Sequence, residues 1–509
     1  MWNFLYPILG LGILFLGSCQ KQPGYPYLQV NYEDKDSQES AFLAAFFADT
    51  EQLEALQLRL LPDEGPAVSA QPVKPDIHLD FCVSWKYEAP LGDIPLSKTW
   101  FVPREDTLAG RIDTTLAACR GGTETLIPLA ELEPPFVALR VDGLSVEDAG
   151  YPLVRTVGIR VGAEILVDTE KQARIQALER ALGSAPNPLV GAPAIFWIAS
   201  GGDLMLDQGA SALLFNEGPG GIFGGTAEFL AGADLALVNL EGVVSSRGTK
   251  VKKSFNFRFD PKIAEALRNT GIDAVLLANN HAFDYGAEGF LDSLDYLEKA
   301  GIGILGAGLD ADAAAHPVVF SERTPVVRAF GIASFPREKN GWDGLTVAAG
   351  KDKPGLLHAE KGGGELLKPH FSGDDASLDI VLFHGGEEWS RRPNSATREL
   401  YKDLIQHGAD LIIGSHPHML QGFEWVLGKP VFWSLGNYMF GGVENTEGRE
   451  EGLFIMLGFW GNRLVYLEPY PLSLSHTRTI IAPPETLSHF YTLSRELRDS
   501  ADTIEKDPH

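Results

Sequence analysis

The sequence predicts an α/β protein, with a large domain over residues 195–470 preceded by a smaller, separate α/β domain over residues 41–190. From residue 194 onwards, apolar runs of strand length alternate with amphipathic stretches of helix length, which is typical of α/β domains. The chain has 509 residues, too many for one ordinary domain. Its content of 44% hydrophobic and 22% charged residues is typical of a globular protein.

Helix ends can be placed from their flanking residues. Asp260-Pro261 predicts a helix start, because Asp is a favoured N-cap and Pro fits the first turn, and Gly271 predicts the end of the same helix. Further amphipathic helices, each followed by a Gly, are predicted over 286–300 and 395–407. Residues 471–509 are expected to form a C-terminal tail that contains a helix.

The N-terminus predicts a lipoprotein signal peptide over residues 1–19. The apolar stretch over 7–18 is too short to span a bilayer comfortably, and Cys19 follows it. Leu16-Gly17-Ser18-Cys19 resembles a bacterial lipobox, in which the Cys is lipidated and becomes the first mature residue. The alternative is a short uncleaved anchor, since no Lys or Arg precedes the stretch. Both alternatives predict a protein of the cell envelope, lipid-anchored in the first case and facing the periplasm or the exterior.

Residues 20–40 are polar and predict a linker, and the domain predicted over 41–190 contains no chemical motif that we can identify. Its two cysteines, Cys82 and Cys119, are compatible with a disulfide in an oxidising compartment and equally with two isolated thiols. A second linker is predicted where Pro and Gly are dense, over 186–193.

The formal net charge is −26. A chain this acidic lacks the basic footprint that nucleic-acid binding requires, so nucleic acid is excluded as a general partner. An anionic substrate would also be repelled by the overall field, and it would need local contacts with metal ions or arginine.

Polar side chains follow the apolar runs at the points where the predicted strands end. They are Asp203, Glu241, Asn280, His281, His384, His416, His418 and Asn437. In an open α/β sheet the carboxyl ends of the strands share one rim, where ligands bind. Asp, Glu, Asn and His are also the side chains that hold divalent metals. Each signature alone is as easily a turn or a helix cap, but their recurrence at successive strand ends predicts a metal site.

Local spacing adds detail to this prediction. His416 and His418 are two residues apart, so in an extended segment both rings point the same way. His281 is suited to act as an acid or base, and Asp284 could orient its ring through the ring N–H. The glycine-rich run over 218–225 lacks the Lys of a P-loop and predicts a mobile loop instead.

Several of these segments together resemble the CapA-type poly-γ-glutamate capsule biosynthesis family. The matching segments are Gly202-Asp203-Leu204-Met205, Asn239-Leu240-Glu241, Phe257-Arg258, Asn279-Asn280-His281-Ala282-Phe283-Asp284, His384-Gly385-Gly386-Glu387-Glu388-Trp389, Ser415-His416-Pro417-His418 and Gly436-Asn437. The resemblance covers residues 195–470. That family is similar to the calcineurin-like metallophosphatases, so the resemblance implies a four-layer sandwich of two β-sheets flanked by helices.

The resemblance also implies a site with two divalent ions, whose identity among Mn, Zn, Fe and Mg is not distinguished. Asp203 and His418 would hold one ion, Asn280, His384 and His416 the other, and Glu241 would bridge them. His281 would be the proton donor, with Asp284 beside it. Arg258, Glu388 and Asn437 would contact the substrate.

The sequence departs from the family's pattern at the metal-ligand positions. Met205 stands where metallophosphatases carry a His, and the bridging Asp is Glu241, so the first ion is expected to bind weakly or to be absent. The usual His-Trp-Gly is His384-Gly385-Gly386 here, which is expected to open space beside His384.

Two functions follow as hypotheses. The first is a metal-dependent hydrolase of a phosphoester or related bond, working in capsule, poly-γ-glutamate or exopolymer synthesis. The second is a non-catalytic component that uses the same site to grip an anionic polymer for export or anchoring. The expected partners are the anionic polymer or phosphoester, the membrane through the lipid anchor, and other capsule-synthesis proteins.

Overall fold

The computed structural model describes residues 101–161 and 194–505, apart from short gaps, together with isolated strands nearer the N-terminus. The gaps are residues 110, 121, 149–150, 207, 323, 336, 338–341, 375, 442–449 and 476. The chain divides into two compact units, Met1–Thr99 with Val154–Gly191, and Trp100–Leu153 with Ala192–His509. The lipobox at Cys19 lies outside the described residues.

The first unit contains strands β1 (Tyr27–Tyr32), β2 (Arg59–Leu60), β3 (Ile77–Trp85) and β9 (Val154–Val161). Strand β1 is parallel to β2 and β3, and β3 is antiparallel to β9. Strand β1 falls within the segment predicted as a linker over 20–40, so that prediction is wrong there. Leu28 and Val30 alternate with polar residues in a strand pattern, which the low apolar content of the whole segment obscured.

Residues 100–153 group with the large unit rather than with the rest of the predicted 41–190 domain. Their elements are the end of β4 (Ile94–Asp106), β5 (Asp113–Thr114), α3 (Leu116–Arg120), β6 (Leu126–Pro128), β7 (Phe136–Ala138) and β8 (Arg140–Val141). Arg140 Nε lies 2.5 Å from Glu468 Oε1, and Tyr466 Oη accepts a hydrogen bond from the Val146 N–H. Cys119 is a free and buried thiol, so it forms no disulfide. The predicted domain boundaries otherwise stay predictions.

The first sheet of the large unit has 8 strands, in the order β15-β14-β11-β10-β25-β26-β27, with β24 paired to β10. Their bounds are β10 (Phe196–Met205), β11 (Leu235–Leu240), β14 (Ala274–Leu276), β15 (Gly303–Leu305), β24 (Asn437–Phe440), β25 (Glu451–Trp460), β26 (Arg463–Ser475) and β27 (Arg478–Ile481). Strands β10, β11, β14 and β15 are parallel neighbours, so their carboxyl ends share one edge. The strands expected after Leu453 are β25 and β26, which pair antiparallel.

The second sheet has 6 strands, in the order β17-β18-β20-β21-β23-β22. Their bounds are β17 (Val318–Phe320), β18 (Val326–Ser334), β20 (Ser377–Gly385), β21 (Leu411–Ser415), β22 (Leu420–Val426) and β23 (Lys429–Leu435). Strands β18, β20, β21 and β23 are parallel. This unit also contains two pairs of short strands. They are β12 (Val243–Val244) with β13 (Arg258–Phe259), and β16 (Ala307–Gly308) with β19 (Gly355–Leu356).

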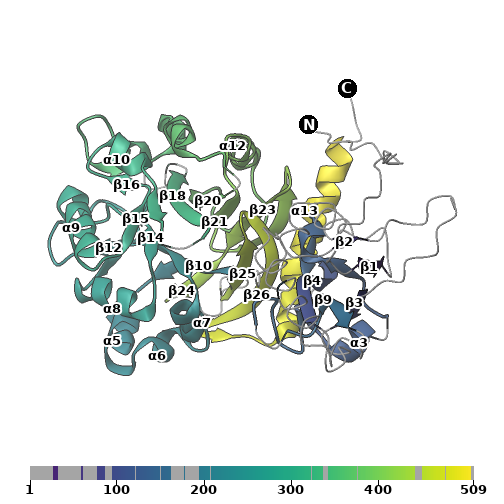
Figure 1. Cartoon of the computed structure of the whole chain (residues 1–509). Coiled ribbons are helices and arrows are strands. Elements are labelled where there is room, and N and C mark those ends of the chain that lie inside the picture. The colour runs from purple at the N-terminus through teal and green to yellow at the C-terminus, as the bar shows by residue number, and fades with distance from the viewer. Residues whose placement is uncertain are drawn as a thin grey trace, which may run out of the picture. The chain divides into compact units, whose positions relative to one another are not determined.

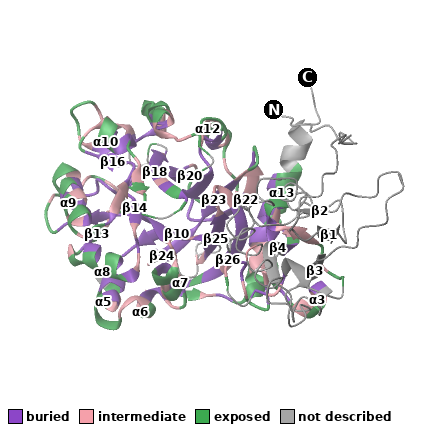
Figure 2. Cartoon of the chain, in the orientation of Figure 1, coloured by how far each residue is buried: buried purple, intermediate pink, exposed green. Residues whose placement is uncertain are grey.

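The two sheets share one hydrophobic core. Strand β20 shows how, because its residues alternate between two sets of neighbours. Leu378, Ile380 and Leu382 join the core that also contains Leu237 and Leu276 of the first sheet. Val381 and Phe383 face the other way, into the cluster with Tyr401 and Leu404 of α12 (Ser395–Gln406). Figure 2 shows the strands of both sheets largely buried, with the exposed residues on the surrounding helices.

The predicted helices are confirmed as α8 (Lys262–Thr270), α9 (Gly286–Lys299) and α12 (Ser395–Gln406), and the tail contains α13 (Leu487–Glu505). Figure 1 shows α8 and α9 beside β14 and β15, and α12 beside β20 and β21. The remaining helices are α5 (Gln208–Glu217), α6 (Pro219–Phe223), α7 (Thr226–Gly232), α10 (Ala311–Ala315) and α11 (Gly363–Leu367). Helix α6 occupies the glycine-rich run predicted as a loop, because Pro219 suits a first turn and Ile222 and Phe223 are buried.

The structure confirms a mixed α/β protein with several sheets and surrounding helices. Within the described part of the chain, no helix is both long and apolar enough to cross a bilayer.

The close approach of β10 to the segment before β24 requires glycine at position 202. A Cβ atom on Gly202 would lie 1.9 Å from the Gly436 carbonyl oxygen, which belongs to the backbone and cannot rotate away. The neighbouring Asp203 N–H donates to that same carbonyl at 3.0 Å. The approach therefore positions Asp203 as well as the two strands.

We expect Gly202→Ala to lower the free energy of unfolding by at least about 1–3 kcal/mol, the usual range for overpacking a core. Urea denaturation followed by circular dichroism would measure the change. Gly232→Ala at the end of α7 is the matched control, since its Cβ would meet nothing within 4 Å, and it should be neutral or slightly stabilising. Equal stability of the two variants would contradict the packing described here.

Candidate metal site

The carboxyl ends of strands from both sheets bring the predicted polar side chains together. Asp203 lies in β10, Glu241 directly follows β11, and Asn280 and His281 follow β14 in the first sheet. His384 lies in β20, and His416 and His418 follow β21 in the second sheet. Asn437 begins β24, opposite Asp203. All eight of these side chains are buried.

Hydrogen bonds fix Asp203 at the join between the two sheets. Its Oδ1 accepts from Asn239 Nδ2 at 2.7 Å, and its Oδ2 accepts from the His416 backbone N–H at 3.2 Å. The imidazole of His418 also lies beside it, with Nδ1 3.2 Å from Oδ2. One carboxylate is therefore anchored by strand ends from both sheets.

A chain of imidazole and amide groups lies next to Asp203. His384 Nε2 is 3.0 Å from Asn280 Oδ1 and 3.1 Å from His416 Nδ1. On the other side of the ring, His384 Nδ1 is 3.0 Å from Asn239 Nδ2 and 3.2 Å from Ser415 Oγ. Donor atoms from strands distant in the sequence thus converge to within hydrogen-bond distance.

Glu241 is the group that these contacts leave without a partner. Neither carboxylate oxygen of Glu241 has a hydrogen-bond partner, although the side chain is fully buried. Burial, and then the charge of Asp203, raises the pKa of the Glu241 carboxyl well above its usual value. An unpartnered buried carboxylate next to a second carboxylate is unfavourable unless a cation compensates it.

These residues fit a divalent cation. One ligand atom each from Asp203, Glu241 and His384 lies within 4.8 Å of the other two. His416 Nε2 is also buried without a hydrogen-bond partner. Carboxylates and imidazoles are the donors that first-row divalent ions take in proteins. A cation at this position would give partners to the atoms that the protein alone leaves unsatisfied.

The two buried carboxylates act on the imidazole of His418. Burial by itself lowers the pKa of its imidazole, but Glu241 and the hydrogen bond to Asp203 outweigh burial and raise that pKa to about 9. This pKa favours a positive charge on the ring beside Glu241 and Asp203. By contrast, burial and the neighbouring histidines lower the pKa of His384 and of His416, which keeps both rings neutral and able to bind metal.

The backbone at the histidine pair is in an unusual conformation. His416 has a φ of 99° and His418 a φ of 55°, both in the left-handed region that non-glycine residues rarely occupy. Such conformations persist only where surrounding contacts enforce them, and they gather at functional sites. The turn after β21 thus carries strain where it presents two rings to the site.

His281 forms a separate arrangement at the edge of this cluster. Its Nδ1 lies 2.6 Å from Asp284 Oδ2, as expected for an imidazole oriented through its ring N–H, and its Nε2 lies 3.8 Å from Glu241 Oε1. Phe257 packs against the ring with centroids 4.2 Å apart. Burial, the largest influence, lowers the pKa of His281.

Lys253 supports the His281–Asp284 pair, a role that the sequence around it does not indicate. Its side chain is 1% exposed, and Nζ donates to Asp284 Oδ1 at 2.9 Å and to the Asn280 carbonyl at 2.7 Å. The ammonium group also lies 4.3 Å from the centre of the Trp342 ring. In the sequence Lys253 belongs to the run Lys250-Val251-Lys252-Lys253, which looks like an ordinary solvated loop. Asn239 belongs to a segment that matches the family's motifs, but nothing in the sequence marks it as the partner of Asp203 and His384.

A cavity of about 610 Å³ opens onto this cluster. Asn280, His281 and His416 reach its wall, and Lys253, Arg337, Glu388 and Trp389 are among the residues around it. Trp389 is 40% exposed and stacks on His418 with ring centroids 5.1 Å apart. A substrate entering the cavity would meet His281 and the metal ligands at its inner end.

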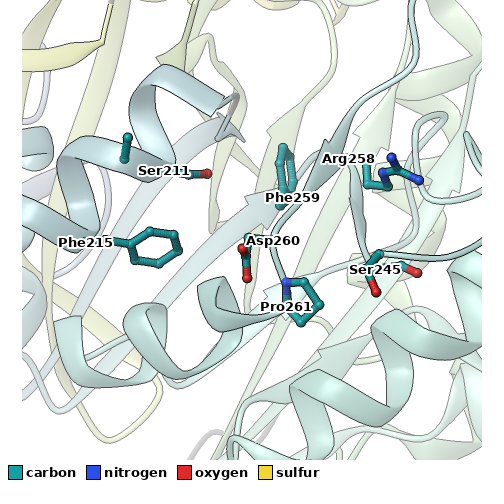
Figure 3. A pocket seen from close by; sticks show the side chains of 9 residues that line it. Ser211, Phe215, Ser245, Arg258, Phe259, Asp260 and Pro261 are labelled. Atoms are coloured by element: carbon teal, nitrogen blue, oxygen red, sulfur yellow. The ribbon is translucent and has the colours of Figure 1, made fainter.

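Arg258 lies elsewhere. Its guanidinium group stacks over Tyr285, 4.2 Å from the ring centre, and it lines a different pocket of about 400 Å³. Figure 3 shows that pocket, with Arg258 and Ser245 on one side and Ser211 and Phe215 on the other. The structure therefore brings together the expected metal ligands, His281, Asp284, Asn437 and Glu388, but it does not bring Arg258 into the same cavity.

The structure bears on two of the departures from the family's pattern, those at Met205 and Gly385. Met205 is buried and packs in the hydrophobic core, so the position offers no ligand to the site. Gly385 does not open space beside His384, and that expectation is wrong. A Cβ on Gly385 would lie 1.9 Å from the Ser334 carbonyl oxygen, so the neighbouring strand β18 already occupies the space.

Comparison with known proteins agrees with the motifs. Residues 197–442 match the family described as bacterial capsule synthesis protein PGA_cap. The PGA biosynthesis protein CapA of Bacillus subtilis (strain 168) is 28% identical over 244 residues, which are 47% of this chain and 62% of that protein. The capsule biosynthesis protein CapA of Bacillus anthracis is 28% identical over 251 residues, 47% of this chain and 58% of that protein. The chain thus spans 62% and 58% of the lengths of these relatives.

A solved structure described as a novel phosphatase from Mycoplasma pneumoniae covers 55% of this chain and 94% of its own. Its sequence identity is 15% and its TM-score 0.35, too low to bear on the fold or the reaction. The family match, in contrast, covers residues 197–442, the region that contains every metal-ligand candidate of this site. Residues 197–442 thus match the CapA-type family of bacterial capsule synthesis proteins, in agreement with the resemblance of the motifs.

Proposed function

We propose that this chain is a cell-envelope protein of capsule, poly-γ-glutamate or exopolymer synthesis that hydrolyses a phosphoester or a related bond with divalent metal ions. The observation that carries this proposal is the fully buried Glu241, which has no hydrogen-bond partner and lies 3.8 Å from His281, a residue that lines the cavity. We further propose that the two sheets with their helices form a metallophosphatase-like four-layer sandwich.

Two ions are proposed, divided as the family resemblance implies. Asp203 and His418 would hold one, and Asn280, His384 and His416 the other, with Glu241 between them. The short distances from His384 Nε2 to Asn280 Oδ1 and His416 Nδ1 support the second group as one ligand set. The buried Met205, which offers no imidazole, favours weaker binding of the first ion.

When bound, the ions would supply positive charge that stabilises the developing charge on the scissile group and assists deprotonation of a water nucleophile. The protein's own contribution is a positioned acid. Asp284 accepts a hydrogen bond from His281 Nδ1–H and stabilises the imidazolium form of the ring, in which Nε2–H donates a proton to the departing oxygen and leaves a neutral imidazole. Lys253 donates a hydrogen bond to the other oxygen of Asp284, and Phe257 packs against the imidazole ring of His281. The acid is therefore oriented before a substrate binds.

The alternative is a non-catalytic site that grips an anionic polymer for export or anchoring. It is favoured by the mouth of the cavity, where Phe255 and Trp389 are 69% and 40% exposed beside the cationic Arg337. Exposed aromatic and cationic groups can hold a flexible anionic chain without cleaving it. The relatives' names speak of biosynthesis and do not specify a reaction.

The anchor is part of the proposal. If Cys19 is lipidated, Cys19→Ala should move the protein out of the membrane fraction or leave an unprocessed precursor, as immunoblots of fractionated cells would show. Unchanged partitioning and processing would remove the lipid anchor from the proposal without affecting the metal site.

Glu241→Gln should change two measured quantities in opposite directions. It should raise the stability of the metal-free protein and lower its affinity for metal. The metal-free variant should be more stable than the wild type, by roughly 1 kcal/mol, because the amide replaces a buried carboxyl that has no hydrogen-bond partner and that is repelled by Asp203 when it is ionised. Its affinity for Mn²⁺ or Zn²⁺ should fall by more than about 100-fold, since loss of an outer-shell contact alone costs roughly 10–100-fold.

Glu468→Gln is the matched control, because Glu468 is also buried but is paired with Arg140. That variant should be less stable than the wild type and should keep its metal affinity. Calorimetry would give both quantities. A Glu241→Gln protein that binds metal like the wild type would refute the assignment of Glu241.

His281→Gln separates hydrolysis from polymer binding. The variant should retain metal and fold but lose turnover by about 100–10,000-fold, the usual contribution of a general acid. Phosphoesters with acidic leaving groups should be affected least, because such groups depart without a proton. His407→Gln, on the exposed end of α12, should behave as the wild type.

The measurement is steady-state hydrolysis of aryl phosphoesters of graded leaving-group pKa, with added Mn²⁺. Suppose that the metal-loaded wild type hydrolyses none of them, while wild type and His281→Gln support polymer production equally in cells. The hydrolase proposal would then be wrong, and the polymer-gripping alternative would replace it.

A further inference from the structure

A second group of metal-ligand side chains lies outside the cavity, on the helices that cover the second sheet. Asp312 and His316 are one helical turn apart, at α10 and the residue that ends it, and His370 ends the short helix η4 (Lys368–His370). One ligand atom from each of the three lies within 4.8 Å of the other two. The two imidazole rings contact each other, with centroids 4.5 Å apart.

The protein fixes the tautomer of one ring. His316 Nδ1 lies 2.8 Å from the Asp312 backbone carbonyl oxygen, which can only accept, so Nδ1 carries the proton. The lone pair is then on Nε2, the atom that remains available to a ligand. A ring N–H donated to a backbone carbonyl is the usual support of a metal-binding histidine.

The surrounding charges are compatible with a bound cation. Lys368, two residues before His370, is engaged by Glu365 at 2.6 Å and by Asp403 at 2.9 Å. The nearest lysine in the sequence is therefore held by carboxylates of its own.

We propose that Asp312, His316 and His370 form a surface Zn²⁺ site, independent of the metal site in the cavity. Two imidazoles and one carboxylate suit Zn²⁺, which takes three protein ligands and leaves further positions to water. Mg²⁺ and Ca²⁺ prefer oxygen ligands only and are not expected here. A Zn²⁺ ion at this position would cross-link α10 to η4, two segments that are distant in the sequence.

The chain provides a matched control at the end of α12. His407 Nδ1 lies 2.8 Å from the Asp403 carbonyl oxygen, and the same nitrogen is 3.4 Å from the Asp403 carboxylate. This repeats the Asp312–His316 pair at the same spacing. Among the described residues, however, no second histidine joins it to complete a ligand group. His407 thus reproduces the local motif without the predicted site.

The test is the number of Zn²⁺ ions bound, measured by competition with a chromophoric chelator. We expect wild type and His407→Ala to bind one more equivalent than His316→Ala and His370→Ala. The affinity for that ion should fall by more than about 100-fold in the latter two variants. An equal number of ions with equal affinity in all four proteins would overturn the proposal.

A second measurement uses the unaltered protein, in case either variant fails to fold. Zn²⁺ should protect His316 and His370 from diethyl pyrocarbonate, as peptide mapping by mass spectrometry would show, while His407 should react equally with and without Zn²⁺. Equal modification of His316 in both conditions would overturn the proposal. Neither experiment depends on hydrolysis or on the cavity site, whose failure would leave this result intact.

Discussion

The structure of the large unit depends on placing two carboxylates, Asp203 and Glu241, next to each other in the interior. Asp203 is satisfied by an amide and a backbone N–H, but Glu241 has no hydrogen-bond partner among the described residues. Two buried carboxylates cost more than either alone, because each also opposes the charge of the other. A protein retains such a pair when a cation compensates it. The neutral imidazoles of His384 and His416 and the charged imidazole of His418 surround that position.

The backbone is built to bring these groups together. The strand ends that carry the ligands belong to two sheets, and glycines allow the segments between them to approach. A Cβ at Gly202, Gly385 or Gly452 would in each case lie 1.9 Å from a carbonyl oxygen of a neighbouring strand or loop. These positions adjoin Asp203 and His384 or pack against Asn437. The glycines near the motifs therefore serve close backbone packing, and the ligand geometry follows from it.

Much of this could be predicted from the sequence. The helices α8, α9 and α12 have N-terminal and C-terminal signals that depend on a few neighbouring residues, and the predictions for them are confirmed. The polar residues at strand ends can be recognised from the sequence, because a clear apolar run precedes each of them. The sequence predicts that these residues meet at the rim of one sheet, whereas in the structure they lie at the carboxyl ends of strands from two sheets. Which strands pair depends on contacts between distant residues, and the pattern along the chain does not contain that information.

The remaining differences have the same cause. Lys253 is charged and lies in a lysine-rich run, so only the tertiary structure reveals that it is buried against Asp284 and Trp342. Arg258 follows Phe257, which packs on His281, but the strand directs the arginine toward a separate pocket. A strand was missed at Tyr27–Tyr32 because average composition outweighed a short alternating pattern. Neighbouring residues in the sequence can therefore serve different sites.

The central claim is that a cation compensates Glu241 and Asp203. The most direct measurement is anomalous diffraction from crystals grown with Mn²⁺ or Zn²⁺, recorded on both sides of the absorption edge of the ion. The account predicts an anomalous peak within bonding distance of a Glu241 carboxylate oxygen, with Asp203 or His384 as a further ligand. An ordered Glu241 side chain with no anomalous peak beside it, in crystals saturated with the ion, would contradict the account.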